Sequence, residues 1–317
     1  MRTQQLQYPI ALAVAALVLP ATADIIYSGY QHIEIPADYD GLFLNVEDET
    51  WNTYPDPPPA LPPEHHLSAG GPIAGVTGWD INPFYGGLVV ANSPDFQPVR
   101  SGTLATSAIV NLATGTTVNS GSTYSTFTQG PLGENPGGPG YGISDGTHLG
   151  TGAGQFEGDP DEHLGFQLNG TQYGWMRAVF TNNTAGAYIE DWAYETTTGS
   201  IVVGRVRQHA PVGNTQLFTL SPQTGESFTL GSAIEDDGII VNRVEKTGDG
   251  TVTLGAVNTY TGLTTINGGV LAVATIGNGG VAGNLGQASV DSANLVLNGG
   301  TLRSEERRVG KECRSRW

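Results

Sequence analysis

The chain has 317 residues, of which 30 are acidic and 13 basic, giving a net charge of −17 at neutral pH. A surface this negative repels nucleic acid and anionic membranes, so neither is an expected partner. The single cysteine excludes an internal disulfide. Glycine is abundant, with 46 residues, and no long segment after the N-terminus has helical periodicity, so we expect an all-β protein.

Residues 1–23 have the layout of a secretory signal peptide. Arg2 is the only charge, residues 10–19 are apolar, and Ala21-Thr22-Ala23 supplies small residues for signal peptidase. The apolar run is too short to cross a membrane, which takes about 20 residues. We therefore expect cleavage before Asp24 and an exported chain, at the outer membrane or cell surface or outside the cell. No transmembrane span is expected after the signal.

Residues 24–206 are expected to form one domain of short strands. Nine segments are rich in Val, Ile or aromatic residues and bounded by Gly, Pro, Asn or Asp. These segments are 25–27, 33–35, 42–46, 88–91, 103–112, 164–168, 174–181, 187–194 and 200–206. Several antiparallel strands with one buried face predict a β-sandwich or jelly-roll-like fold.

A repeat follows this domain. Ile-Asn-Gly-Gly-Val-Leu at 266–271 returns as Leu-Asn-Gly-Gly-Thr-Leu at 297–302, an offset of 31 residues. Short β-branched runs separated by Asn-Gly turns are typical of a chain that winds into stacked rungs. We expect residues 239–302 to form the start of a parallel β-helix. Residues 207–238 are expected to be either a linker or its cap.

The motifs in 246–302 resemble the autotransporter-associated β-strand repeat, also called the passenger-associated transport repeat. They are Lys246-Thr-Gly-x-Gly-Thr-Val-Thr-Leu254, Asn258-Thr-Tyr-Thr-Gly262, Thr264-Thr-Ile-Asn-Gly-Gly-Val-Leu271 and Leu295-Val-Leu-Asn-Gly-Gly-Thr-Leu302. The resemblance implies a right-handed β-helix in a secreted or surface protein, with further rungs. Segments 163–170, 172–177 and 189–195 resemble domains of exported bacterial proteins with a C-terminal sorting signal, which generally have no assigned activity.

The last fifteen residues differ from the rest of the chain. Residues 303–317 contain six of the 13 basic residues and Cys313, and they interrupt the repeat directly after Leu302. A basic tail that binds anions is one interpretation. We favour another, that the string is a translated sequencing adapter at the end of a truncated reading frame, so that the natural protein is longer.

The densest group of carboxylates predicts a calcium site. Glu157, Asp159, Asp161 and Glu162 lie in a loop rich in Gly and Pro, and Ca²⁺ prefers such oxygen ligands. The spacing is not that of an EF-hand, so a solvated acidic turn is the alternative. No cofactor is required by the sequence, and Ca²⁺ is the one ion it suggests.

Four aromatic residues predict a platform for stacking sugars: Tyr173, Trp175, Tyr188 and Trp192. The alternative is that they belong to the core of the sandwich. Glu157, Glu190 and Asp191 are the nearest candidates for glycoside hydrolysis, but no spacing fixes two of them at a catalytic separation, and we assign no catalytic residue.

Taken together, these patterns favour a structural or adhesin-like protein without evident catalysis. Its partners would be a polysaccharide or the surface of a host or neighbouring cell. A carbohydrate-binding or carbohydrate-cleaving exoprotein is the alternative.

Overall fold

The predicted all-β class is confirmed by the computed structural model. Within the described residues the regular elements are strands, with one short 3-10 helix, η2 (Ser292–Asn294). None of the described helical segments is long and apolar enough to cross a membrane. The described residues are 23–36, 41–53, 76, 80–84, 87–90, 96–103, 107–124, 162–179, 186–197 and 199–305.

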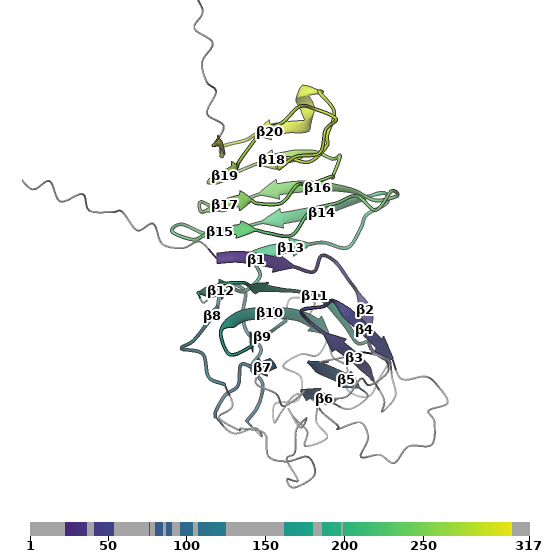
Figure 1. Cartoon of the computed structure of the whole chain (residues 1–317), viewed down its shortest axis with the longest axis vertical. Coiled ribbons are helices and arrows are strands. Elements are labelled where there is room, and N and C mark those ends of the chain that lie inside the picture. Colours follow the sequence, from purple (N-terminus) through teal and green to yellow (C-terminus); the bar gives the residue numbers. More distant parts are fainter. Residues whose placement is uncertain are drawn as a thin grey trace, which may run out of the picture.

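Two larger antiparallel sheets and the two-stranded sheet of β8 (Thr117–Asn119) and β12 (Ser200–Val202) make up the N-terminal part of the described structure (Figure 1). One larger sheet has the order β4-β3-β5-β6. Its strands are β3 (Leu42–Asn45), β4 (Thr50–Thr53), β5 (Ile81–Phe84) and β6 (Gly87–Val90). The other runs β7-β9-β10-β11, with β2 also paired to β11. Its strands are β2 (Ile33–Glu34), β7 (Phe96–Pro98), β9 (His163–Leu168), β10 (Gln172–Val179) and β11 (Tyr188–Glu195).

A hydrophobic core lies between these two sheets. Phe166, Met176 and Trp192 project from the β9–β11 sheet and pack in one cluster with Leu44 and Ile81 from the other. All five are fully buried. Burying a side chain of this size contributes about 1.5–3 kcal/mol, so this cluster is the main source of stability for the sheet pair.

The C-terminal part is a stack of parallel rungs (Figure 1). The chain alternates between two sheets, and each pass adds one parallel strand to each sheet. One sheet contains β14 (Thr215–Leu220), β16 (Val241–Lys246), β18 (Thr264–Ile266) and β20 (Leu295–Leu297). The other contains β15 (Ser227–Leu230), β17 (Thr251–Leu254), β19 (Val270–Val273) and β21 (Thr301–Ser304).

The offset of 31 residues found between the sequence repeats is also the separation between paired residues of adjacent strands in this stack. Ile266 pairs with Leu297 and Leu271 pairs with Leu302, each partner 31 residues further along the chain. The stacking begins before residue 239, because β14 and β15 already pair in parallel with β16 and β17. Of the two alternatives for residues 207–238, the structure favours a cap that includes the first rung. The right-handed winding stays a prediction.

One strand joins the two parts of the molecule. β1 (Ala23–Tyr27) pairs antiparallel with β11 and parallel with β15, so both parts share one ten-stranded sheet. A second link is β13 (Val206–Gln208), which pairs antiparallel with β14. The expected boundary at residue 206 therefore falls inside a strand that adjoins the first rung.

Some expected strands differ from the structure. Segment 200–206 is divided by a turn into β12 (Ser200–Val202), which pairs with β8 (Thr117–Asn119), and β13. The expected strand 103–112 is wrong in its described part, where only isolated bridges occur at Ile109 and Asn111. The sequence did not predict strands β4 and β5. All residues of β4 are exposed, so it lacks an apolar pattern, and β5 contains Pro83, a residue that is rare inside strands.

The turns between rungs lie in close backbone contact. Gly269 has φ +59°, and a Cβ built there would lie 2.3 Å from the carbonyl oxygen of Gly250 in the preceding rung. Beside it, the Lys246 amine donates hydrogen bonds to the carbonyls of Thr247 (2.6 Å), Gly248 (2.8 Å) and Gly268 (3.1 Å). Burial lowers the pKa of Lys246 to about 8. The amine thus links turns of successive rungs.

We predict that Gly269→Ala destabilises the protein by about 2–4 kcal/mol, because the new methyl group meets the adjacent rung and a positive φ alone costs only about 1–2 kcal/mol. Gly277→Ala is the matched control, since Gly277 also has a positive φ (+70°) but nothing lies within 4 Å of its Cβ position. Urea denaturation of both variants measures the difference. Equal losses would mean that the rungs are not stacked this closely.

Candidate functional site

A buried ion pair lies where the antiparallel sheets meet the first rung. Arg177 in β10 and Asp191 in β11 pair through two hydrogen bonds, with 3.0 Å between Nε and Oδ1. The Tyr27 hydroxyl also donates to Asp191 at 2.6 Å. Burial acts to lower the pKa of Arg177, but the hydrogen bond and charge of Asp191 outweigh it and raise that pKa. Burial raises the pKa of Asp191, and the hydrogen bond and charge of Arg177 oppose this rise. Both side chains of the ion pair are buried.

Polar side chains extend this contact into the rungs. The Tyr27 hydroxyl accepts a hydrogen bond from the backbone N–H of Gln208 at 2.7 Å. The Gln208 amide in turn donates to Gln216 at 2.8 Å and to Asn242 at 2.9 Å. Gln216 and Asn242 are paired residues of β14 and β16. A continuous network thus runs from Arg177 to the second rung.

A cavity of about 320 Å³ opens beside Arg177. Strands β9, β10, β13 and β14 all contribute to its wall. The lining residues are Thr114, His163, Trp175, Arg177, Gly204, Val206, Arg207, His209, Thr219 and Ser221. Two arginines and two histidines are among these residues, and none of the described residues in this wall carries a carboxylate. We call this cavity the junction cavity.

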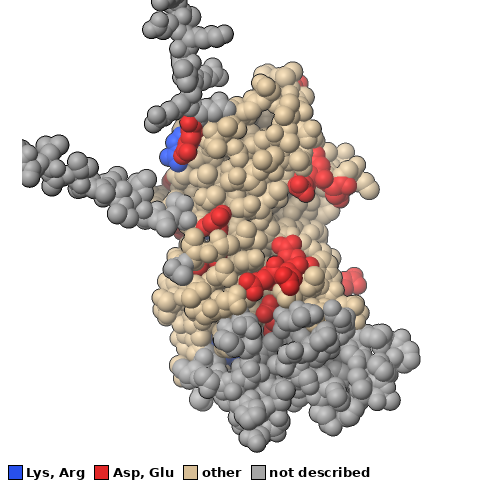
Figure 2. All heavy atoms as spheres, in the orientation of Figure 1, with Lys and Arg blue, Asp and Glu red and all other residues tan. Residues whose placement is uncertain are grey.

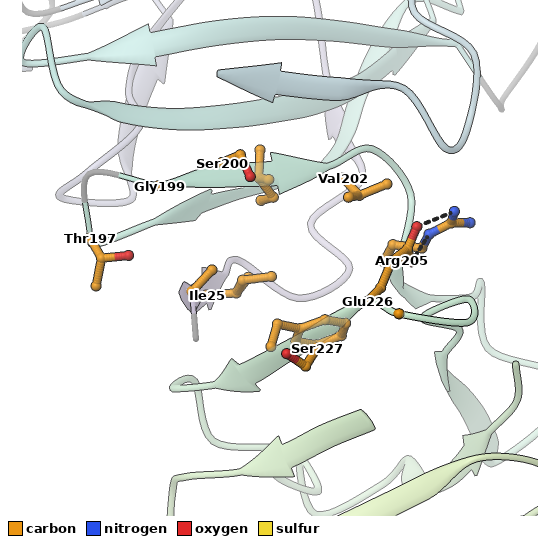
Figure 3. Close-up of a pocket in the computed structure, with 12 residues that line it drawn as sticks. Ile25, Thr197, Gly199, Ser200, Val202, Arg205, Glu226 and Ser227 are labelled. Atoms are coloured by element: carbon orange, nitrogen blue, oxygen red, sulfur yellow. Dashed lines mark hydrogen bonds and ion pairs between the residues drawn. The ribbon is translucent and has the colours of Figure 1, made fainter. Parts of the chain in front are cut away.

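A second cavity of about 360 Å³ lies at the seam of β1, β12 and β15 (Figure 3). Ile25, Val202 and Phe228 give it apolar walls, and at its rim Arg205 forms an ion pair with Glu226, with 2.7 Å between Nε and Oε2. Because Arg205 and Glu226 neutralise each other, this second cavity has no net charge from them with which to attract a charged ligand.

The structure does not support the predicted sugar platform as one surface. Tyr173 and Trp175 are buried in the core that faces the rungs, whereas Trp192 is buried in the core between the antiparallel sheets. Rings enclosed on opposite faces of a sheet cannot stack on one sugar. Tyr188 is half-buried. Trp175 and Met176 are neighbours on β10 and pack in different clusters, as expected for side chains that alternate along a strand.

Tyr188 belongs to a small surface cluster that the sequence did not indicate. The His32 ring lies 4.4 Å from that of Tyr188 and stacks on Tyr30 at 5.6 Å, centroid to centroid. The Nδ1 of His32 lies 2.8 Å from the Glu190 carboxylate. His32 has φ +45°, a conformation rare outside glycine. No sequence motif signals this contact, because 158 residues separate His32 from Glu190.

The hydrolase candidates do not form a catalytic pair in the described structure. Glu190 lies at an irregularity in the pairing of β10 with β11, where Arg177 pairs with Asp191 and Ala178 pairs with Ile189, and its carboxylate contacts His32. Asp191 is fully buried and bound to Arg177. Glu157 lies outside the described residues.

The predicted calcium site lies largely outside the described residues. Of its four carboxylates only Glu162 is described, and it is buried at the start of β9. Among the described residues no group of three or more His, Cys, Asp or Glu side chains is arranged to hold a metal ion. Calcium binding stays a prediction.

Acidic side chains dominate the charged surface. Asp and Glu gather over the middle of the face shown in Figure 2, and Lys and Arg are scarce there. Several of these carboxylates have structural partners. Asp236 accepts hydrogen bonds from the backbone N–H groups of Asn242 and Thr261, and so joins two successive rungs. The acidic turn at 235–237 is part of the stack.

Comparison with known proteins agrees with this geometry. The family model of the passenger-associated-transport-repeat matches residues 244–273. The chain carries a passenger-associated transport repeat. The match ends at the last residue of β19, so the repeat spans the end of β16, then β17, β18 and β19. Within the repeat, Lys246 and Gly269 make the contacts between rungs described above.

One curated relative is an adhesin. A stretch of 91 residues is 44% identical to the "Adhesin BmaC autotransporter" of Brucella suis biovar 1 (strain 1330). That stretch covers 29% of this chain but only 3% of the relative. No solved structure matches the chain.

We predict that Asp191→Asn destabilises the protein by about 3–5 kcal/mol, because it leaves the Arg177 charge buried without a counter-charge. Glu190→Gln is the control. Its carboxylate is buried, but its partner His32 has a side chain that is 42% exposed, so its loss should cost less than the loss of Asp191. Thermal and urea denaturation of both variants check this. A loss for Asp191→Asn no larger than the control's would show that the pair is not buried as described.

Proposed function

We propose that this protein is an exported bacterial surface protein with a structural or adhesin-like role and without evident catalysis. The observation that carries the proposal is the coincidence of the transport repeat at 244–273 with a full coil of the parallel stack. The similarity of 91 residues to an autotransporter adhesin supports the same role. The relative named as an adhesin is a far longer protein, of which the match covers 3%. An adhesive role for this chain is therefore part of our proposal.

The architecture suits a load-bearing surface element. Each rung adds about 4.8 Å of length and pairs its backbone N–H and C=O groups with the rungs beside it. Such pairing leaves few backbone segments open to proteases. The column Phe228, Val252, Leu271 and Leu302 continues the core from rung to rung. The stack can therefore extend without adding a new kind of core.

The described residues favour binding over cleavage. Glycoside hydrolysis needs two carboxyl groups that face one site, about 5–9.5 Å apart. Asp191 is fully buried and bound to Arg177, and the Glu190 carboxylate is paired with His32, so both carboxyl groups are already engaged. We propose that the partners are a polysaccharide or the surface of a host or neighbouring cell, with the protein at the outer membrane or cell surface. The signal peptide predicted at residues 1–23 would supply the export that this location requires.

Beads coated with the purified full chain test the adhesive role. We expect them to be retained on an epithelial cell layer or on immobilised bacterial polysaccharide about tenfold better than beads coated with albumin, because many weak contacts add up on one bead. Beads coated with the same chain after heat denaturation are the matched control. Retention equal to both controls on every surface would contradict the adhesive role.

A further inference from the structure

We propose that three aromatic side chains at the surface bind the ammonium group of a basic saccharide, one built from hexosamine residues that lack the acetyl group. The rings are those of Tyr30, His32 and Tyr188, and we call them the His32 cluster. Tyr30 and His32 lie in the segment between β1 and β2, and Tyr188 is the first residue of β11. The proposal rests on the proposed surface role and deepens it by naming a site and a class of saccharide.

The first argument is the arrangement of the rings. The His32 ring contacts both tyrosines, stacking on Tyr30 at an interplanar angle of 12° and lying 4.4 Å from Tyr188, centroid to centroid. The His32 side chain is 42% exposed and both tyrosines are half-buried, so solvent reaches the cluster. The face of an aromatic ring is electron-rich and attracts cations. The rings thus form an accessible surface that suits an ammonium group.

The second argument is that the backbone holds these rings in place. The backbone N–H of Tyr30 donates to the Gln208 side chain at 2.8 Å. The N–H groups of Gln31 and His32 both donate to the carbonyl oxygen of Glu190, at 2.8 and 3.2 Å. These bonds keep His32 at φ +45°, and strained backbone of this kind is concentrated at binding and catalytic sites. Because the rings are ordered before a ligand arrives, binding costs less conformational entropy.

The third argument is the charge beside the rings. The Glu190 carboxylate lies 2.8 Å from Nδ1 of His32. Glu34 is the cross-strand partner of Tyr188, so the two side chains share a face of the sheet. Among the described residues, neither of these carboxylates pairs with a Lys or Arg. Burial raises the pKa of Tyr30 and of Tyr188, and the charge of Glu190 raises both further. Negative charge beside aromatic faces favours a cationic ligand over an anionic one.

The fourth argument concerns the tyrosine hydroxyls. Neither the Tyr30 nor the Tyr188 hydroxyl has a hydrogen-bond partner among the described residues. A tyrosine combines an apolar ring with a polar tip, and a sugar likewise combines an apolar C–H face with a rim of hydroxyl groups. An amino sugar can place its ammonium over a ring while its hydroxyls bond the tyrosine tips, whereas a lysine side chain would leave those tips unpaired. These contacts favour a saccharide as the carrier of the ammonium group.

Isothermal titration of the full chain with three hexasaccharides tests the proposal. They are the hexamers of glucosamine from chitosan, of N-acetylglucosamine from chitin and of glucose from cellulose. All three share one backbone linkage and differ only in carrying an ammonium, an acetamido or a hydroxyl group on the same ring carbon. We expect the glucosamine hexamer to bind at physiological salt and the other two to bind at least about tenfold more weakly.

Variants that leave the net charge unchanged locate the site. Tyr30→Leu and Tyr188→Leu should each weaken binding of the glucosamine hexamer by about threefold, and by about tenfold together. Trp51→Leu is the matched control, because Trp51 is a 41% exposed aromatic residue of β4 in the other sheet, and its affinity should be unchanged. Circular dichroism checks that the variants are folded. Tyr188→Phe removes only a hydroxyl group, and it should weaken binding by about twofold even if the leucine variants do not fold.

The outcomes are distinct. Equal binding of the three hexamers, or the same loss of affinity in Trp51→Leu as in the double variant, overturns the proposal. Hexalysine that binds as tightly as the glucosamine hexamer, with the same loss in Tyr188→Leu, would overturn the saccharide as the ligand. Coated beads separate this site from the general role. If the beads are retained but the double variant binds the glucosamine hexamer as the unchanged chain does, the site is wrong and the adhesive role stands.

Discussion

The two-sided pairing of β1 is the constraint on which the rest of the structure depends. A parallel stack leaves a row of unpaired N–H and C=O groups at its first rung, and such an edge must be covered. Residues Ala23–Ile25 pair with Phe228–Leu230 on that edge, while Ile25–Tyr27 pair with β11 on the other side. One short strand thus covers the β15 edge of the stack and attaches that sheet to the antiparallel strands, while β13 covers the β14 edge.

The buried polar network follows from this position of β1. Tyr27 lies at the end of the strand, where its hydroxyl reaches Asp191 on one side and the backbone of Gln208 on the other. Its backbone N–H also bonds the Ser232 hydroxyl at 2.6 Å, just beyond β15. The hydrophobic core is likewise continuous, from Trp175 in β10 to Val273 in β19. The junction cavity exists because two differently built parts meet here without filling the space between β9–β10 and β13–β14.

The sequence predicted the repeating part of the fold well and the junction poorly. Ile266 and Leu297, which are 31 residues apart in the repeat, are paired residues of adjacent strands, because equivalent repeat positions lie above one another in a parallel stack. The pairing of β1 with β15 joins residues more than 200 positions apart and leaves no local signal. The aromatic platform failed for a related reason. It assumed a sheet with one exposed face, whereas the rungs cover the second face of β10 and bury Trp175 there.

Of the residues that line the junction cavity, Arg207 and His209 are two positions apart in the sequence, a spacing that places side chains on one face of a strand. The sequence does not indicate which other residues lie next to Arg207 and His209. Arg177 and His163 come from strands of the other part of the molecule, and only the docking of the first rung brings them to the same wall.

Hydrogen exchange of the backbone amides tests the central role of β1 most directly. If β1 couples the two parts, the amides of β11 and β15 should open together with one free energy, and Ile25→Pro, which removes a central N–H of β1, should lower the protection of both strands. Protection of β15 and β17 that persists unchanged in Ile25→Pro would contradict the account, since the stack would then be stable without its cap.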